Sequence, residues 1–444
     1  MRRFFLMVTA LTLSCGAAIA QTANGASGVD ENGAIQKYRR SSLYSVLIKH
    51  STFPYGEAID SAFMAMPTPD KFNNHDAGPK SFESSAVKMK KKGDQKALTN
   101  TADIEQFILS NNIPHQMVAK WFNRNADNGA FNLDLMIERG LYDAQQVDIE
   151  AAKASSRNIM SLGDAGEELI GKTFLLVNDI TFVDQGERTQ KAAGWLKAVG
   201  QIAGAVTGSS GLSTLGNVAG SAVNEFDGFT VNITSYLYRL DWSPEVAETF
   251  WSEYWIDQDN LDNAKRAAFD DSGLFKLSYV GETTTSAANV SSKSFSNKSK
   301  ADQMLKVCTR AVDKSIVELQ REYDEFKVNV PIGNINADSK TVEVAIGLKE
   351  GINEKSQFDV LMKVQNEDGS YTYDKVGKLQ PIKGQIWDNR FGALEEAQAL
   401  AEDGKSADKE GNPMLTATTF KILDGANRIV PGCLVREVTI KRTK

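Results

Sequence analysis

Histidine and cysteine are scarce in this sequence, with three of each among 444 residues. His50, His75 and His115 do not show the His-x-x-x-His spacing that places two metal ligands on one helix face. The Gly-x-Ser-x-Gly turn that exposes a nucleophilic serine is missing as well. The sequence therefore predicts no catalytic residue, no metal site and no cofactor.

Two short runs come closest to a ligand-binding motif. Residues 166–173 match the glycine and lysine spacing of a phosphate-binding loop, but such a loop must follow a strand and open a helix. Here a predicted strand begins at Lys172, so we interpret the run as a turn from a helix into a strand. Residues 73–76, Asn-Asn-His-Asp, offer oxygen and nitrogen donors, and we interpret them as a turn built by Asn and Asp.

Clusters of basic residues and long apolar runs are also lacking. The net charge is −7, and 88–92 is the one strongly basic run, so we predict no nucleic-acid partner. Residues 1–20 read as a signal peptide, because Arg2 and Arg3 precede an apolar run that ends before Ala18-Ile-Ala20. That run is shorter than the roughly 20 residues that a membrane span needs. We therefore expect an exported protein.

The most unusual stretch is a glycine-rich insertion, 185–228, between two predicted strands, 172–184 and 229–242. Residues 198–224 contain no charge, and glycine recurs every fourth residue in two predicted helical arms that meet at 208–211. Such spacing lets another backbone approach closely. The predicted contact residues of this hairpin are Trp195, Leu196, Val199, Gly200, Ile202, Gly204, Val206, Gly208, Leu212, Leu215, Gly216 and Gly220.

Three interpretations of the insertion remain open. It could be a helical pair or loop folded onto its own sheet, a hairpin that binds a partner or a second copy, or a hairpin that touches a membrane. Each arm is shorter than the roughly 20 residues of a spanning helix. Glycine also costs an exposed helix about 1 kcal/mol relative to alanine, which indicates a packing reason for the repeated glycines.

The remaining chain predicts an α+β protein. Residues 21–162 read as a mainly helical region with helices over 36–50, 103–109, 113–122, 133–139 and 143–162. A central α/β unit over 163–330 holds the insertion and ends with a helix at 301–326. In the region 331–444, turn residues separate short predicted strands, which indicates a small closed barrel; these strands are 341–347, 356–364, 371–379, 385–387, 417–423 and 434–440.

Two aromatic sites have both a structural and a functional interpretation. Trp251 and Trp255 lie on a predicted acidic helix, 243–257, where they form a buried face or line a sugar-binding cleft with nearby carboxylates. In the barrel, Trp387, Asp388, Asn389 and Arg390 are a candidate recognition edge, with an ordinary Asp–Arg ion pair as the alternative. Cys308 and Cys433 either pair or stay as two buried thiols.

Residues 40–45, Arg-Ser-Ser-Leu-Tyr-Ser, and 67–76 resemble a group of uncharacterised secreted proteins of Gram-negative bacteria, in particular of the Bacteroidota. The resemblance implies an exported protein of the cell envelope, in the periplasm or at the outer membrane, and no activity. The segments 346–352, 358–360, 375–378 and 431–432 resemble the SH3-like barrels appended to periplasmic flagellar-assembly proteins, which bind partners. The insertion 391–415, with a helix over 394–401, departs from that pattern.

These features lead to one hypothesis and two alternatives. The hypothesis is a non-enzymatic envelope protein that acts by assembly, either with itself or with another envelope protein. The first alternative is a hydrolase of envelope glycan or peptide that uses the carboxylates around Trp251. The second is a membrane-associating oligomer that inserts the glycine-rich hairpin.

Overall fold

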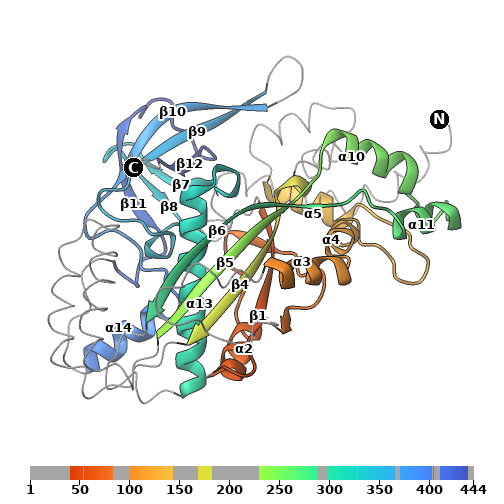
Figure 1. The fold of residues 1–444 in the computed structure, drawn as a ribbon. Coiled ribbons are helices and arrows are strands. Elements are labelled where there is room, and N and C mark those ends of the chain that lie inside the picture. Colours follow the sequence, from red (N-terminus) through yellow and green to blue (C-terminus); the bar gives the residue numbers. More distant parts are fainter. Residues whose placement is uncertain are drawn as a thin grey trace.

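The computed structural model describes residues 41–53, 55–83, 101–143, 169–182, 230–288, 299–327, 329–365, 371–402, 404 and 411–438. These residues form an α+β fold with an open central sheet and a separate closed barrel (Figure 1). The long helix α13 (Lys300–Glu322) contacts both of them. The predicted signal peptide 1–20, the helix over 144–162 and the insertion 185–228 lie outside the described residues.

The central sheet has the strand order β2-β1-β4-β5-β6. β1 pairs in parallel with β2, β3 and β4, whereas β5 runs antiparallel to both β4 and β6. The strands are β1 (Ser41–Lys49), β2 (Phe72–Asn74), β3 (Ser81–Glu83), β4 (Thr173–Phe182), β5 (Thr230–Leu240) and β6 (Leu277–Ala288). The two strands predicted to flank the insertion are therefore confirmed as β4 and β5, and the structure shows that they pair with each other.

The prediction of a helix over 36–50 is wrong, because Ser41–Lys49 is strand β1 at the centre of the sheet. Its apolar residues fit a helical stripe only because both faces of the strand are buried. Tyr44, Val46 and Ile48 face one core, and Leu43 and Leu47 face the other. A strand covered on both sides loses the alternation of polar and apolar residues that identifies most strands. The region 21–162 thus contributes a central strand as well as helices.

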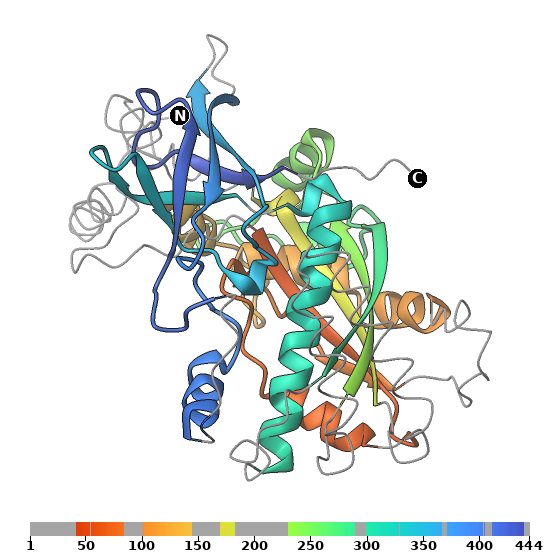
Figure 2. The same cartoon turned by 90° about the vertical axis from the view of Figure 1, so that its left-hand side faces the viewer.

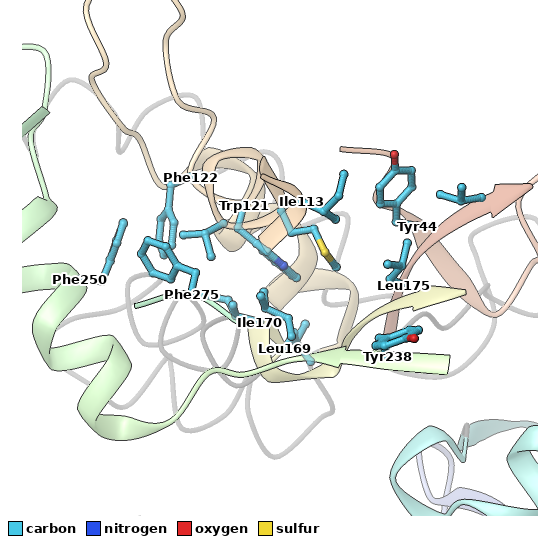
Figure 3. Close-up of a cluster of buried hydrophobic side chains, with 14 of the residues drawn as sticks. Tyr44, Ile113, Trp121, Phe122, Leu169, Ile170, Leu175, Tyr238, Phe250 and Phe275 are labelled. Carbon is cyan, nitrogen blue, oxygen red and sulfur yellow. The ribbon is translucent and has the colours of Figure 1, made fainter. Parts of the chain in front are cut away.

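Both faces of the sheet are covered by helices. One face packs against an aromatic core that includes Trp121, Phe122 and Phe250 (Figure 3). The helices on that face are α3 (Thr101–Ser110), α4 (Ile113–Trp121), α5 (Asp134–Asp143), α10 (Pro244–Thr249) and α11 (Asn263–Asp270). The opposite face packs against α2 (Gly56–Met64) and α13 through a mainly aliphatic core that also contains Phe72, Phe174 and Phe326. Along β1, β4 and β5, side chains alternate between the two cores.

The C-terminal part forms a closed six-stranded barrel in the order β10-β11-β8-β7-β12-β9. Its strands are β7 (Val330–Asn336), β8 (Thr341–Val344), β9 (Phe358–Gln365), β10 (Tyr371–Pro381), β11 (Thr418–Asp424) and β12 (Leu434–Glu437). The core includes Val344, Val360, Leu379 and Phe420, all fully buried. The predicted closed barrel and the helix in its long connection, α14 (Ala393–Glu402), are confirmed. The predicted strand 385–387 is only an isolated bridge at Trp387.

Several other predictions can be compared with the structure. The helices expected at 103–109, 113–122 and 301–326 are present as α3, α4 and α13, while β6 and β7 were not predicted as strands. Cys308 and Cys433 are both buried and unpaired. Within the described ranges, no helix has both the length and the apolar character required to cross a membrane.

Candidate functional site

The carboxyl ends of the parallel strands β1, β3 and β4 meet at one edge of the sheet. Ligand sites of open α/β sheets are found outside the carboxyl ends of their strands, so this edge is the first place to look for one. His50 and Ser51 directly follow β1, Glu83 ends β3, and Asp179 lies near the end of β4. These four residues form the candidate site.

A buried histidine–carboxylate pair is the centre of this site. His50 Nε2 lies 2.6 Å from Asp179 Oδ1, and the two side chains are only 3% and 5% exposed. The imidazole stacks on Phe53 with a centroid distance of 4.5 Å and an interplanar angle of 6°. Among the described residues, no hydrogen-bond partner reaches the buried Nδ1 atom of His50. The imidazole thus uses one ring nitrogen for Asp179, and the other lies buried without a partner in the described part of the chain.

A second polar pair lies beside the first one. The backbone N–H of Ser51 donates to Glu83 Oε1 at 2.9 Å, and its hydroxyl donates to Oε2 at 2.7 Å. Desolvation opposes ionisation of Glu83, but the two Ser51 hydrogen bonds and nearby Lys49 outweigh it, so the pKa of Glu83 is lowered. The Ser51 hydroxyl is therefore bound to a carboxylate that is ionised at neutral pH.

The turn between β1 and α2 is tightly constrained. Tyr55 has a φ angle of 61°, a left-handed conformation that is uncommon for a bulky residue, and its ring lies 4.3 Å from that of Phe182. A Cβ atom on Gly56 would lie 2.1 Å from the carbonyl oxygen of His50. Backbone strain of this kind concentrates at functional sites, which makes the turn part of the candidate site.

A cavity of about 10 Å³ lies inside this edge, and its lining includes His50, Phe53, Ile59 and Phe182. A cavity of that size has room for about one water molecule. The Ser51 hydroxyl is engaged by Glu83 and the ring of His50 is covered by Phe53. In this arrangement the polar groups fix the ends of three strands, and the cavity is too small for an organic substrate.

The sequence offered no signal for this site, because His50 and Asp179 are 129 positions apart. The predicted contact residues from Trp195 to Gly220 lie outside the described residues. The structure does place the two points at which that segment joins the sheet. Phe182 and Val231 are paired neighbours on β4 and β5, at the same edge as the candidate site.

The candidate recognition edge in the barrel has mainly internal contacts. The carbonyl oxygen of Trp387 accepts a hydrogen bond from the Leu348 N–H at 2.9 Å. Asn389 accepts from the Lys349 N–H at 2.8 Å and donates to Glu350 Oε2 at 2.7 Å. These bonds hold the 3₁₀ turn Leu348–Glu350, which packs beside α13.

The alternative interpretation of that edge, an Asp–Arg pair, is present. Arg390 binds Asp388 in a bidentate manner, with distances of 2.8 and 2.7 Å. The Asp388 side chain is 9% exposed, whereas that of Arg390 is 42% exposed. These contacts give the segment 387–390 a structural role, which is to hold the neighbouring 3₁₀ turn and to form an Asp–Arg pair. Its role in recognition stays a prediction.

The aromatic residues around Trp251 contact one another. Trp251 and Trp255 pack against Phe122 at 5.3 and 5.9 Å and against Phe250 at 5.2 and 6.1 Å. Phe250 begins a π-helical turn, Phe250–Tyr254, that continues α10. Both tryptophans are half-buried against the aromatic core. This arrangement agrees with the interpretation that they form the buried face of a helix.

The Asn-Asn-His-Asp run is not a plain turn, because Asn73 and Asn74 end strand β2, and its histidine is fully buried. His75 Nε2 lies 2.9 Å from the carbonyl oxygen of Met117, and Nδ1 lies 2.8 Å from Nη1 of Arg139. Burial and the Arg139 charge lower the pKa of His75 well below its usual value, so its imidazole is neutral. Over the ranges that the structure covers, no group of three His, Cys, Asp or Glu side chains could hold a metal ion.

Arg139 was not identified from the sequence, although its guanidinium is at the centre of this buried network. It donates to Ser42 Oγ and to the carbonyl oxygen of Asn74 at 2.9 Å each, and it lies 4.4 Å from the ring centroid of Trp121. The network joins α5, β1 and α4 on one face of the sheet.

Protein-family models give no match to this chain, and the curated proteins contain no significant relative of it.

Proposed function

We propose that this chain is an exported, non-enzymatic protein of the bacterial cell envelope that acts by assembly through its glycine-rich insertion, 185–228. The observation that supports it most directly is the attachment of that insertion to the sheet. Phe182 and Val231 are paired residues of β4 and β5, so the segment leaves and re-enters the fold at neighbouring points. The two points of attachment thus lie side by side at one edge of the sheet.

The strands that carry the insertion form a firm support. In β4, Thr173 to Ile180 are all buried, and most of β5 is buried as well. Buried Asn178 ties the strands to their surroundings, because it donates to Ser45 Oγ at 3.0 Å and accepts from Ser235 Oγ at 2.8 Å. Binding segments are commonly positioned in this way, by a rigid scaffold beneath them.

The sequence of the insertion favours close contact with another protein. Residues 198–224 are uncharged, and their glycines at every fourth position would allow two helices to approach closely. A second copy of the chain or another envelope protein is the proposed partner. The resemblance of the barrel to SH3-like modules adds a second partner-binding element to the proposal. The predicted signal peptide, 1–20, supports export to the periplasm or the outer membrane.

The mass of the mature protein in solution tests this proposal. Light scattering of residues 21–444 is expected to give an assembly, and deletion of 190–226 is expected to give a monomer. Gly204→Leu with Gly216→Leu should weaken the assembly, whereas Gly204→Ala with Gly216→Ala, as the matched control, should preserve it. Equal masses for all four proteins, or loss of assembly with alanine as well as leucine, would contradict close helix packing.

Membrane contact is the second candidate, because an uncharged segment of this length could also enter a bilayer surface. A carbonate wash of the envelope fraction separates the two proposals. Retention of the full chain in the membrane, with release of the protein that lacks 190–226, would favour membrane contact. Release of both would favour assembly between proteins. The hydrolase alternative would need carboxylates that face an open cleft near Trp251.

A further inference from the structure

His115 lies at the contact between two helical segments on the aromatic face of the sheet. It is the third residue of α4, and its ring packs against α11 and the loop that follows α11. The ring centroid lies 5.6 Å from that of Phe269 and 5.0 Å from that of Phe275, at interplanar angles of 76° and 88°. Figure 2 shows α13 in front of the sheet, and the contact at His115 belongs to the core on the opposite face.

This imidazole is buried without a hydrogen bond. His115 is 7% exposed, and neither Nδ1 nor Nε2 has a hydrogen-bond partner within the described residues. The backbone groups of Ser272 and Phe269 lie near the ring, but neither completes a hydrogen bond to it. Buried polar groups are almost always hydrogen-bonded, so this exception calls for an explanation.

The charged groups that face His115, among the described residues, are Asp270 at the end of α11 and Arg124 just after α4. They pair with each other, with Arg124 Nη2 2.9 Å from Asp270 Oδ1. The guanidinium also lies over the ring of Phe269, 4.6 Å from its centroid. A proton on His115 would therefore be a buried positive charge without a counter-ion of its own.

We propose that residues 263–275, which comprise α11 and the loop after it, form a proton-operated latch that stays docked on α4 while His115 is neutral and is released when His115 takes up a proton. In the released state, water would solvate the imidazolium, which the phenylalanine rings cannot do. Release would also expose Phe269 and Phe275, which are 2% and 4% exposed in the docked state. This inference does not depend on the proposed function of the insertion.

The electrostatic environment of His115 supports this direction. Burial is the largest cause that lowers the pKa of His115, and the charge of Arg124 acts in the same direction. Asp270 and the backbone groups of Ser272 and Phe269 act against them without cancelling them. The first turn of a helix also disfavours a cation, because the partial charge at a helix N-terminus is positive.

The pH range follows from linkage. The released imidazole binds a proton more readily than the docked one, so proton uptake favours release. Docking is fully favoured above pH 6.5, the ordinary pKa of the imidazole, and loses stability as the pH falls below that value. Between pH 7.5 and pH 5.5 the equilibrium constant for release should rise by up to about ten-fold.

Amide hydrogen exchange in α11 measures the release. Isolated helices shorter than about 12–15 residues are marginal in water, so α11, with eight residues, should lose its hydrogen bonds when it leaves α4. The readout amides are those of Arg266 and Asp271, which donate to the carbonyl oxygens of Asp262 and Ala267. Because release is local, these amides should be less protected than those of α13, which report unfolding of the whole fold.

The test compares exchange at pH 7.5 and pH 5.5 in the full mature chain, corrected for the intrinsic rate. In the wild type, protection of Arg266 and Asp271 is expected to fall several-fold at the lower pH. It should stay constant in His115→Phe, whose ring takes up no proton, and should fall as in the wild type in His75→Gln, the matched control. Equal pH dependence in the wild type and His115→Phe, its loss in His75→Gln, or equal protection of α11 and α13 would overturn the proposal.

An NMR titration of the histidine rings keeps the test decisive if His115→Phe folds poorly. The chain has three histidines, and the ring of His115 is identified by its nuclear Overhauser contacts with Phe269 and Phe275. Its signal should titrate with a midpoint below 6.5, in the same pH range in which α11 loses protection. A midpoint at or above 6.5, or loss of protection in a different pH range, would refute the proposed role of His115.

Discussion

The buried pair His50–Asp179 should contribute strongly to the stability of the sheet. Replacement Asp179→Ala would remove the acceptor 2.6 Å from His50 Nε2 and leave a buried imidazole without that partner. Breaking a buried charge-assisted pair by removing one member costs about 3–5 kcal/mol. The site is almost free of solvent, since the two side chains are 3% and 5% exposed, so water cannot easily replace the lost contact.

A matched variant separates the charge of Asp179 from its hydrogen bond. Asp179→Asn keeps an oxygen acceptor of the same size in the same place, so His50 can still donate to it. A hydrogen bond to a charged group contributes about 1.5–3 kcal/mol, and one between neutral groups about 0.5–1.5 kcal/mol. The asparagine variant should therefore lose about 1–2 kcal/mol, clearly less than the alanine variant.

Urea unfolding at neutral pH measures both changes. The midpoints should fall in the order wild type, Asp179→Asn, Asp179→Ala, with an unchanged dependence on urea concentration. A loss below about 1 kcal/mol for Asp179→Ala would refute the reasoning, because a pair accessible to water contributes no more than that. Equal destabilisation of the two variants would refute it as well, since the hydrogen bond would then contribute nothing.

Three further predictions concern other parts of the fold. Gly56→Ala should lower the free energy of unfolding by at least about 1–3 kcal/mol in a urea titration, because the new methyl group would overlap the carbonyl oxygen of His50; a neutral result would contradict the turn geometry. Phe420→Ala, inside the barrel, should cost about 3–5 kcal/mol, and a cost below about 1 kcal/mol would show that the site is not packed as described. The pKa of His75 is lowered in the folded protein, so the unfolded chain takes up a proton more readily. The free energy of unfolding should therefore fall as the pH drops below 6.5, the pKa of His75 in the unfolded chain, by up to about 2 kcal/mol at pH 5. His75→Gln should weaken this acid dependence in thermal unfolding, and an identical dependence would exclude His75 as its source.

The sequence was sufficient to predict a helix or strand where its local pattern agrees with its environment in the folded protein. The helix α13 and the strands β4 and β5 were predicted within a few residues, because each has a long, consistent periodicity. β1 was mistaken for a helix, since a strand buried on both faces has no alternation to detect. β6 was missed, because Glu282 to Ala288 is rich in Thr, Ser and Ala and resembles a loop.

The candidate site could not be predicted for a different reason. His50 and Asp179 acquire meaning only when β1 and β4 pair, and their separation in sequence hides that pairing. The same holds for Arg139 and His75, which come together from α5 and the turn after β2. Trp387 to Arg390, in contrast, was noticed from its composition, and the structure shows that its backbone and amide contacts hold the neighbouring turn.

The helix α13 links the two parts of the fold through interactions of different kinds. Its apolar side, with Val307, Val312 and Leu319, is buried against the central sheet. Its polar side meets the barrel through Arg310, which binds Glu396, and Arg321, which binds the Gly351 carbonyl oxygen at 2.8 Å. Apolar burial does not depend on ionisation, whereas contacts between charged groups do. Salt should therefore act first on the contacts between α13 and the barrel, whereas the apolar packing of α13 on the central sheet should change little.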